Sequence, residues 1–310
     1  MRSRLVVICS IAIVGVMAAP AAGATTLVKV IGGPEQQFFP FVNDTYVVWT
    51  QNSEARPGRY NAYADELAAL GNRVKLNEKG TRGYTGGLDP GTNRAIYQQA
   101  DGDRSTLYWF NLDTKARTKV AGVNTRKGWE WAPRVSTSHI LFQRDDLRGH
   151  STMLLYDRTD GSVMALKTTD YNRAFMIAGA VGEQYASWTI CAASCNAFIY
   201  EIATDITRKL ALPKGKHQYA PVVDEDRGSV YFTRSGNGCG VNVRIMRRPV
   251  DDLSAPAETI VSLPDNKDTG WTIALHVDVA NARVDGWFEY YHCGSRQGDI
   301  WEAQELDVLA

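Results

Sequence analysis

Five short segments of the chain combine basic side chains with aromatic ones, and in three of them the aromatic residue directly follows a glycine. Aromatic faces stack on sugar rings and apolar side chains, while Arg and Lys pair with carboxylates or sulfates. The segments therefore predict a site for an anionic glycan or peptide. The alternative is that the rings pack inside the protein and the basic residues are solvated charges. The candidate ligand-binding residues are Arg82, Tyr84, Arg126, Lys127, Trp129, Trp131, Arg173, Lys216, His217, Tyr219 and Trp271.

No group of residues has the spacing of a recognised catalytic motif. The chain lacks a Gly-x-Ser-x-Gly nucleophile elbow, and its carboxylates form no pair at a recognisable spacing. We therefore predict no catalytic residues, no cofactor and no metal ion. If the protein is an enzyme instead, His217, His276 and His292 are the candidates for a base or a metal ligand, and Glu130 and Glu289 could act as an acid or base.

A strand-rich unit that recurs six times would position these residues. Each unit has an apolar first strand, a turn, a second strand that ends in an aromatic residue, and further strands that complete a sheet. The period of 44 to 55 residues is that of a four-stranded propeller blade, and the register of the sixth unit is open by one residue. We therefore predict an all-β, six-bladed β-propeller. The aromatic positions are Trp49, Tyr97, Phe142, Trp188, Phe232 and Trp287.

The two chain ends complete one another in this arrangement. The sixth unit runs out of chain before its fourth strand, whereas segment 26–30 is a strand without partners of its own. We expect 26–30 to pair beside the third strand of the sixth unit, which closes the ring and covers an exposed sheet edge. Segment 62–70 is rich in helix-forming residues, but its place in the repeat favours the third strand and its turn.

The units resemble the TolB-type propeller repeat, in which a first strand with proline precedes an Asp- and Gly-containing turn, an apolar–aromatic strand and a strand with tyrosine. Residues 132–156 and 220–232 match it best, and the resemblance extends over the chain after residue 24. It implies the propeller fold and places the links between blades at the mouth of a central channel. The full Ser-Pro-Asp-Gly turn and the N-terminal domain of TolB are absent, so we do not carry over TolB's role in envelope integrity.

The N-terminus has the pattern of a secretory signal peptide over residues 1–24. A basic start, an apolar run and small residues precede a single propeller domain at 25–310. The 34 basic residues balance the 34 acidic ones, so no overall field favours nucleic acid. No later segment is long and apolar enough to cross a bilayer. We predict a secreted or periplasmic monomer that is not inserted in a membrane once the signal is cleaved.

Four cysteines follow the signal: Cys191, Cys195, Cys239 and Cys293. An even number in an exported chain predicts two disulfides, and four cysteines allow three pairings. Cys191 with Cys195 would close a small loop within one hairpin. Cys239 and Cys293 hold matching positions in neighbouring units, so their bond would join two blades. We favour these two pairs over a metal site that combines cysteines with His292.

Three hypotheses for the function are open. We favour a secreted, non-catalytic binding or scaffold protein that uses the basic and aromatic face for a protein or glycan partner. The alternatives are a propeller lyase or hydrolase that acts on anionic glycans, and a structural envelope protein without a small ligand. Histidine and carboxylate side chains that converge at the mouth would favour the enzyme, whereas exposed aromatic rings without such a cluster would favour binding.

Overall fold

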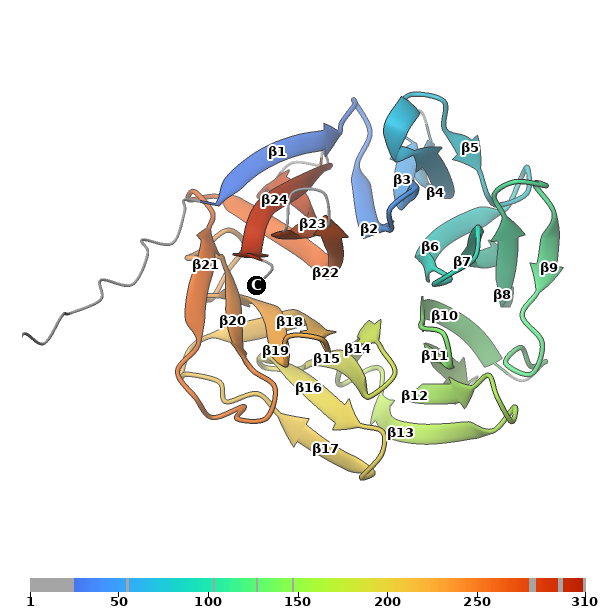
Figure 1. The fold of residues 1–310 in the computed structure, drawn as a ribbon. Coiled ribbons are helices and arrows are strands. Elements are labelled where there is room, and N and C mark those ends of the chain that lie inside the picture. The colour runs from blue at the N-terminus through green and yellow to red at the C-terminus, as the bar shows by residue number, and fades with distance from the viewer. Residues whose placement is uncertain are drawn as a thin grey trace, which may run out of the picture.

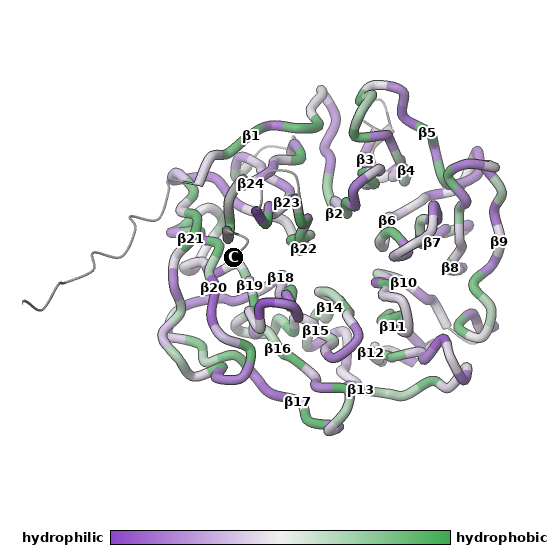
Figure 2. The backbone as a smooth tube through the Cα atoms, viewed as in Figure 1, coloured by the Kyte–Doolittle hydropathy of each residue, from purple (hydrophilic) through white to green (hydrophobic). Residues whose placement is uncertain are grey.

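The computed structural model describes residues 25–53, 56–102, 104–126, 128–146, 148–278, 283–294 and 298–308. The predicted signal peptide and Lys127 lie outside the described residues. Six four-stranded antiparallel sheets stand side by side around a common centre, which confirms the predicted six-bladed β-propeller (Figure 1). Hydrophobic stretches run through the strands nearest the centre, whereas hydrophilic stretches are frequent in the outer turns (Figure 2).

The blades follow one another along the chain, each with its first strand innermost. Blade 1 holds β2 (Gln37–Val42), β3 (Tyr46–Ser53), β4 (Arg56–Glu66) and β5 (Val74–Lys75), and blade 2 holds β6 (Arg82–Leu88), β7 (Arg94–Asp101), β8 (Arg104–Asn111) and β9 (Arg117–Lys119). Blade 3 holds β10 (Gly128–Val135), β11 (His139–Asp146), β12 (His150–Asp157) and β13 (Val163–Asp170), and blade 4 holds β14 (Phe175–Val181), β15 (Tyr185–Cys191), β16 (Cys195–Glu201) and β17 (Ile206–Lys209). Blade 5 holds β18 (His217–Asp224), β19 (Ser229–Ser235), β20 (Arg244–Pro249) and β21 (Glu258–Ser262), and blade 6 holds β22 (Lys267–Asp278), β23 (Arg283–His292), β24 (Gly298–Val308) and β1 (Thr26–Ile31).

The first strand of the chain completes the last blade, as predicted. β1 pairs antiparallel with β24, with Val28 opposite Glu302. This pairing covers the edge that β24 would otherwise expose. Segment 62–70 also follows the repeat: β4 continues to Glu66, and a single 3-10 turn at Leu67–Ala69 follows it.

The aromatic residue of each second strand is a wedge against the preceding blade. Phe142, for example, packs with Ile96 and Leu107 of blade 2 and is fully buried. In blade 6 the predicted position is wrong by one residue. Phe288 packs against blade 5, whereas Trp287 faces blade 1. The reason is a longer bulge in β22, whose register against β23 shifts between Thr269 and Ile273.

The innermost strands share a β-bulge that gives the prolines of the repeat their physical role. The register with the second strand shifts in all six blades, and in three of them the shift falls at an X-Pro pair. Phe39, Ala132 and Ala220 precede these prolines and have left-handed φ values of 53°, 46° and 52°, which are uncommon for residues other than glycine. A bulge leaves one residue unpaired, so it tolerates proline, which has no N–H to donate.

Neighbouring innermost strands approach closely where a glycine faces a proline. A Cβ atom on Gly86 would lie 2.3 Å from Cγ of Pro133 and 2.6 Å from its carbonyl oxygen. We expect Gly86→Ala to lower the free energy of unfolding by about 1–3 kcal/mol, since blades 2 and 3 must separate to admit the methyl group. Chemical denaturation would measure the loss, with Gly33→Ala as the control, because its added Cβ would come no closer than 3.4 Å to any atom. Equal losses in both variants would contradict this account.

Both predicted disulfides are present in the structure. Cys191–Cys195 closes the hairpin between β15 and β16. Cys239–Cys293 joins the segment between β19 and β20 to the end of β23, so it ties blade 5 to blade 6. Within the described residues, no helix has the length and apolarity that a membrane span requires.

Candidate functional site

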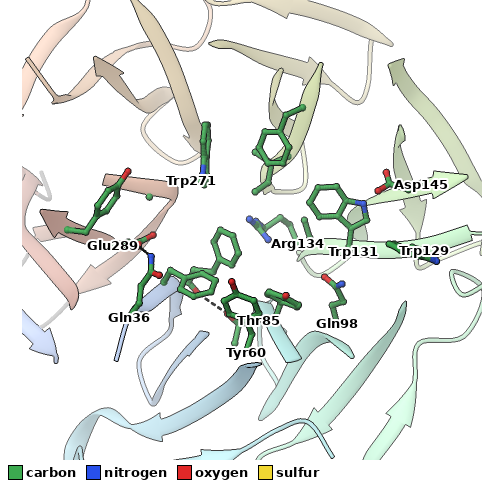
Figure 3. A pocket seen from close by; sticks show the side chains of 18 residues that line it. Gln36, Tyr60, Thr85, Gln98, Trp129, Trp131, Arg134, Asp145, Trp271 and Glu289 are labelled. Atoms are coloured by element: carbon green, nitrogen blue, oxygen red, sulfur yellow. Dashed lines mark hydrogen bonds between the residues drawn. The ribbon is translucent and has the colours of Figure 1, made fainter. Parts of the chain in front are cut away.

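A cavity of about 620 Å³ opens at the centre of the ring, and we call it the central pocket (Figure 3). Its lining comes from blades 1, 2, 3, 4 and 6, where the innermost strands begin and the second strands end. The pocket therefore lies on the face that the inter-blade links share with the hairpins between second and third strands. The lining residues are Gln36, Phe38, Phe39, Tyr60, Tyr84, Thr85, Gln98, Trp129, Trp131, Ala132, Arg134, Asp145, Phe175, Ile177, Gly270, Trp271, Glu289 and Tyr291.

Two arcs of aromatic rings form much of the wall. On one side, the ring centroid of Tyr60 lies 5.6 Å from that of Phe38 and 5.1 Å from that of Tyr84. On the other side, the centroid of Phe175 lies 6.2 Å from that of Trp131 and 5.5 Å from that of Trp271. Such contacts hold the rings in fixed orientations. They leave an apolar cleft of a size that suits a small ligand or the end of a larger one.

Trp129 and Phe175 extend the aromatic wall into solvent. Trp129 is 42% exposed and Phe175 is 41% exposed, although both side chains line the pocket. Exposed apolar side chains that gather at the rim of a cavity are typical of binding surfaces. They therefore offer stacking surfaces at the rim.

The guanidinium of Arg134 is the buried cation of the pocket. It donates hydrogen bonds to the carbonyl oxygens of Pro133, Ala178 and Gly179 and to the hydroxyl of Thr272, at distances of 2.7 to 3.2 Å. These partners belong to blades 3, 4 and 6, so the side chain reaches across the centre of the ring. A guanidinium has five N–H groups. These four bonds use four of them, and the second N–H of Nη1 takes part in none of the four.

No described carboxylate forms an ion pair with Arg134. Besides these acceptors, the ring of Phe41 stabilises the charge, with its centroid 4.7 Å from Cζ. Burial lowers the pKa of Arg134 to about 9, so the group is still cationic at neutral pH. A buried charge held only by neutral acceptors favours any anionic group that enters the pocket.

Glu289 is the buried carboxyl of the same pocket. Gln36 Nε2 donates to Glu289 Oε1 at 2.9 Å. Burial raises the pKa of Glu289 to about 8; the hydrogen bond from Gln36 opposes this rise and the Asp268 carboxylate adds to it. The carboxyl therefore carries its proton at neutral pH and can donate a hydrogen bond.

A glycine makes the space in which Glu289 sits. A Cβ atom on Gly270 would lie 2.2 Å from Glu289 Oε2. Gly270 precedes Trp271, and Gly128 likewise precedes Trp129 and approaches the backbone of Asp145. Two of the three Gly–aromatic pairs thus mark places where an innermost strand passes close to the second strand of its own blade, whereas Gly83 of the third pair faces the Asn77 side chain.

Four of the predicted ligand-binding residues line the central pocket: Tyr84, Trp129, Trp131 and Trp271. Tyr219 adjoins it, with its ring centroid 5.2 Å from that of Trp271 and its hydroxyl donating to Asp268 at 2.6 Å.

The predicted basic residues lie elsewhere. Arg82 donates to the carbonyl of Gly102, and Arg173 is paired with Asp170. Neither these two nor Arg126, Lys216 and His217 belong to the lining.

The three histidine candidates lie apart from the central pocket. His217 accepts a hydrogen bond from the N–H of Cys195 on Nδ1, and its Nε2 lies 3.1 Å from Asn237 Oδ1. His292 is exposed at the end of β23. His276 lies near the other end of β22, with its Nε2 3.4 Å from Asp44.

Glu130, the other predicted acid or base, is fully buried and does not line the pocket. It accepts hydrogen bonds from Thr125 and is paired with Arg144 at 3.0 Å. These contacts give it a structural role.

Two groups of described side chains bring together enough metal-binding atoms for an ion. The first contains Cys239 and Cys293, whose sulfur atoms are consumed by their disulfide. The second is His276 with Asp285 and Glu302. Neither group lies in the pocket lining, so the pocket has no described set of metal ligands.

No protein-family model and no curated protein matches the chain. Solved structures do match it in fold. TolB from Acinetobacter baumannii aligns with a TM-score of 0.55 at 13% identity, over 86% of this chain and 65% of the TolB chain. An oligogalacturonate lyase in complex with manganese aligns with a TM-score of 0.55 at 10% identity, over 91% of this chain and 96% of the lyase. A prolyl endopeptidase aligns with a TM-score of 0.51 at 11% identity, over 83% of this chain and 40% of that enzyme.

The fold and the neighbours define a class: this chain is a TolB-like six-bladed β-propeller. It spans less than two thirds of the TolB chain. The neighbours include both TolB and enzymes, and at such low identity they share the architecture alone. The function must therefore be argued from the pocket.

Proposed function

We propose that the protein is a non-catalytic binding protein, exported from the cytoplasm, whose central pocket binds an anionic glycan. The observation that carries this proposal is Arg134, a buried cation at the pocket that has no described carboxylate partner. A carboxylate or sulfate of the ligand would accept its remaining N–H and neutralise its charge. The two disulfides support export, because such bonds persist in oxidising compartments.

The aromatic arcs and the neutral polar groups favour a glycan over an acidic peptide. Tyr84 and Trp271 supply faces for sugar rings, while Gln36 and Gln98 supply amides that both donate and accept hydrogen bonds. Protonated Glu289 adds a donor without adding a repelling charge. One structural neighbour is named for oligogalacturonate, an anionic oligosaccharide; that likeness concerns fold, and the ligand class proposed for this chain rests on its own pocket.

An array of carboxylated, sulfated and neutral glycans together with acidic peptides tests the proposal. We expect the carboxylated or sulfated glycans to bind and their neutral counterparts to bind at least about tenfold more weakly. Trp129→Ala, which removes an exposed rim ring, should raise the Kd about tenfold. Arg134→Gln should raise it by about 10- to 100-fold, and its folding is to be checked by circular dichroism because Arg134 also bonds to three carbonyl groups.

Two control variants lie outside the pocket lining. Tyr171 is 51% exposed and does not line the pocket, so Tyr171→Ala should leave the Kd unchanged. Lys216→Ala should also leave it unchanged, although the sequence predicted Lys216 as a ligand-binding residue. If glycan binding is unchanged in Trp129→Ala but lost in Lys216→Ala, the ligand binds at the basic residues of the inter-blade links and not in the central pocket. Selective binding of acidic peptides would replace the glycan with a peptide ligand.

Glu289 favours one rival function, hydrolysis or elimination at an anionic glycan with this carboxyl as the general acid. A pKa of about 8 keeps the proton available near neutrality. The pocket lining contains Asp145 as its other carboxylate and no histidine. Release of shorter glycans by the protein but not by Glu289→Gln would establish this rival, while unchanged glycans at high protein concentration would exclude it.

A further inference from the structure

Three side chains with metal-binding atoms converge on blade 6 near the end that lies away from the central pocket. His276 of β22, Asp285 of β23 and Glu302 of β24 each place one such atom within 4.8 Å of the other two. His276 and Asp285 are directly opposite one another in the β22–β23 ladder. Three adjacent strands thus contribute one residue each to a single cluster.

The cluster faces blade 1, across the junction where the ring closes. Side chains two residues apart on a strand share a face of the sheet. His276 and Asp285 therefore share a face with Ala274 and Trp287, and these two pack against Val47 and Trp49 of blade 1. Blade 1 also contributes a group of its own, because Asp44 Oδ1 lies 3.4 Å from Nε2 of His276.

Carboxylates predominate among the described side chains of this cluster. Asp44, Asp285 and Glu302 are three carboxylates, and the described cation among them is Arg283, whose Nε lies 3.0 Å from Asp285 Oδ2. Asp285 is buried, and Glu302 is partly buried. The ligand atoms of Asp285 and Glu302 lie within 4.8 Å of one another, and like charges at that distance repel one another. A bound cation would attract both carboxylates and offset their repulsion.

One imidazole nitrogen of His276 is available to bind a metal ion. Its Nδ1 is buried and has no described hydrogen-bond partner, whereas buried polar atoms are nearly always paired. One ring nitrogen can thus bind a metal ion while the other bonds to a carboxylate, the arrangement found around most histidine ligands.

We propose that His276, Asp285 and Glu302 form a binding site for a divalent transition-metal ion, with Zn²⁺ as the preferred occupant. One imidazole nitrogen with carboxylate oxygens is a donor set that zinc accepts, with water as a further ligand. Ca²⁺ and Mg²⁺ favour sites built from oxygen alone. The sequence predicted no metal ion, because these three residues have no recognised metal-ligand spacing and only the strand pairing of blade 6 brings them together.

A metal ion at this position would act on the closure of the ring. Its ligands would tie β22, β23 and β24 together, and Asp44 would connect them to blade 1. An ion that binds the folded chain and not the unfolded one stabilises the folded state by mass action. The site therefore predicts stabilisation by metal without any change at the central pocket.

The test uses protein without a histidine tag, treated with EDTA and dialysed. Isothermal titration with ZnCl₂ should give one site per chain, and saturating zinc should raise the Tm by a few degrees. His276→Gln should weaken zinc binding by about tenfold or more and remove the rise in Tm. Asp44→Ala changes a side chain that is 88% exposed, so it tests the link to blade 1 without risk to the core, and it should reduce the rise in Tm.

His150→Ala is the matched control. His150 also has a carboxylate partner, Asp146 at 3.0 Å, but it lies in blade 3 and outside any described metal-binding group. Zinc binding should be the same in this variant as in the unaltered protein. Failure of zinc, Mn²⁺ and Co²⁺ to bind the unaltered protein, or equal binding by the His276→Gln variant, would overturn the proposal. Glycan binding is measured separately, so that failure would not bear on the proposed function.

Discussion

Replacing Glu289 with glutamine is expected to raise the free energy of unfolding at pH 8 by on the order of 4 kcal/mol and to leave it nearly unchanged at pH 4. The pKa of this buried carboxyl is about 8 in the folded protein, against an ordinary value of 4.5. Between these values the folded state holds one more proton than the unfolded state. The contribution of Glu289 is therefore fully present below about pH 4.5 and is lost progressively as the pH rises toward 8. Glutamine keeps the shape and cannot ionise.

Urea denaturation of both proteins across pH 4 to 9 measures this difference. The unaltered protein should lose stability steadily above pH 5, whereas Glu289→Gln should give a flatter profile. Glu66→Gln is the control, because Glu66 is exposed and should have little effect on the profile. Parallel profiles for the unaltered protein and Glu289→Gln would show that Glu289 does not retain its proton at neutral pH. This result would also exclude Glu289 as the proposed hydrogen-bond donor in the pocket.

Removing the Cys239–Cys293 disulfide by changing both residues to serine is expected to lower the free energy of unfolding by about 4 kcal/mol. This bond closes a loop with a sequence separation of 54 residues, and the chain-entropy account gives a cost that grows with the length of the loop. The same double change at Cys191 and Cys195, where the separation is 4 residues, should cost only about half as much.

Each double variant is the control for the other, since both remove two sulfur atoms from hairpins on the same face. Guanidinium denaturation under non-reducing conditions gives the two losses directly. A larger loss from the short loop than from the long one would mean that local strain or packing, and not the tie between blades 5 and 6, sets the contribution of these bonds.

Much of the fold could be predicted from the sequence because its signals repeat. The wedge aromatics recur at every blade. The prolines at 40, 133 and 221 fall at bulges, and a central strand would not tolerate a proline elsewhere. The closure by β1 and both disulfide pairs followed from the same alignment of units. The error at Trp287 arose where the repeat itself changes, because β22 has a longer bulge that displaces the wedge to Phe288.

Less of the candidate site could be predicted, because its chemistry depends on neighbours from different blades. The aromatic rings were visible in the inter-blade links, where three of them directly follow a glycine, and four predicted rings line the pocket: Tyr84, Trp129, Trp131 and Trp271. Arg134 follows a bulge proline in an innermost strand and gave no signal of its own. Its importance comes from carbonyl groups of blade 4 and a hydroxyl of blade 6. Likewise, the proton on Glu289 depends on burial beside Gly270, which periodicity does not reveal.

The position of β1 has a consequence for how the polypeptide becomes a ring. Blade 6 combines β22, β23 and β24 with β1, which lies far earlier in the chain. The sheet of this blade therefore cannot be completed until synthesis has passed β24. The end of β24 lies beside the start of β1, since the two strands pair antiparallel and Gln304 is opposite Thr26. A circularly permuted gene that encodes 26–31 after residue 308, through a short hairpin turn, would make all six blades contiguous. Such a permutant should fold faster than the natural order, because its final closure would no longer require the termini to find each other.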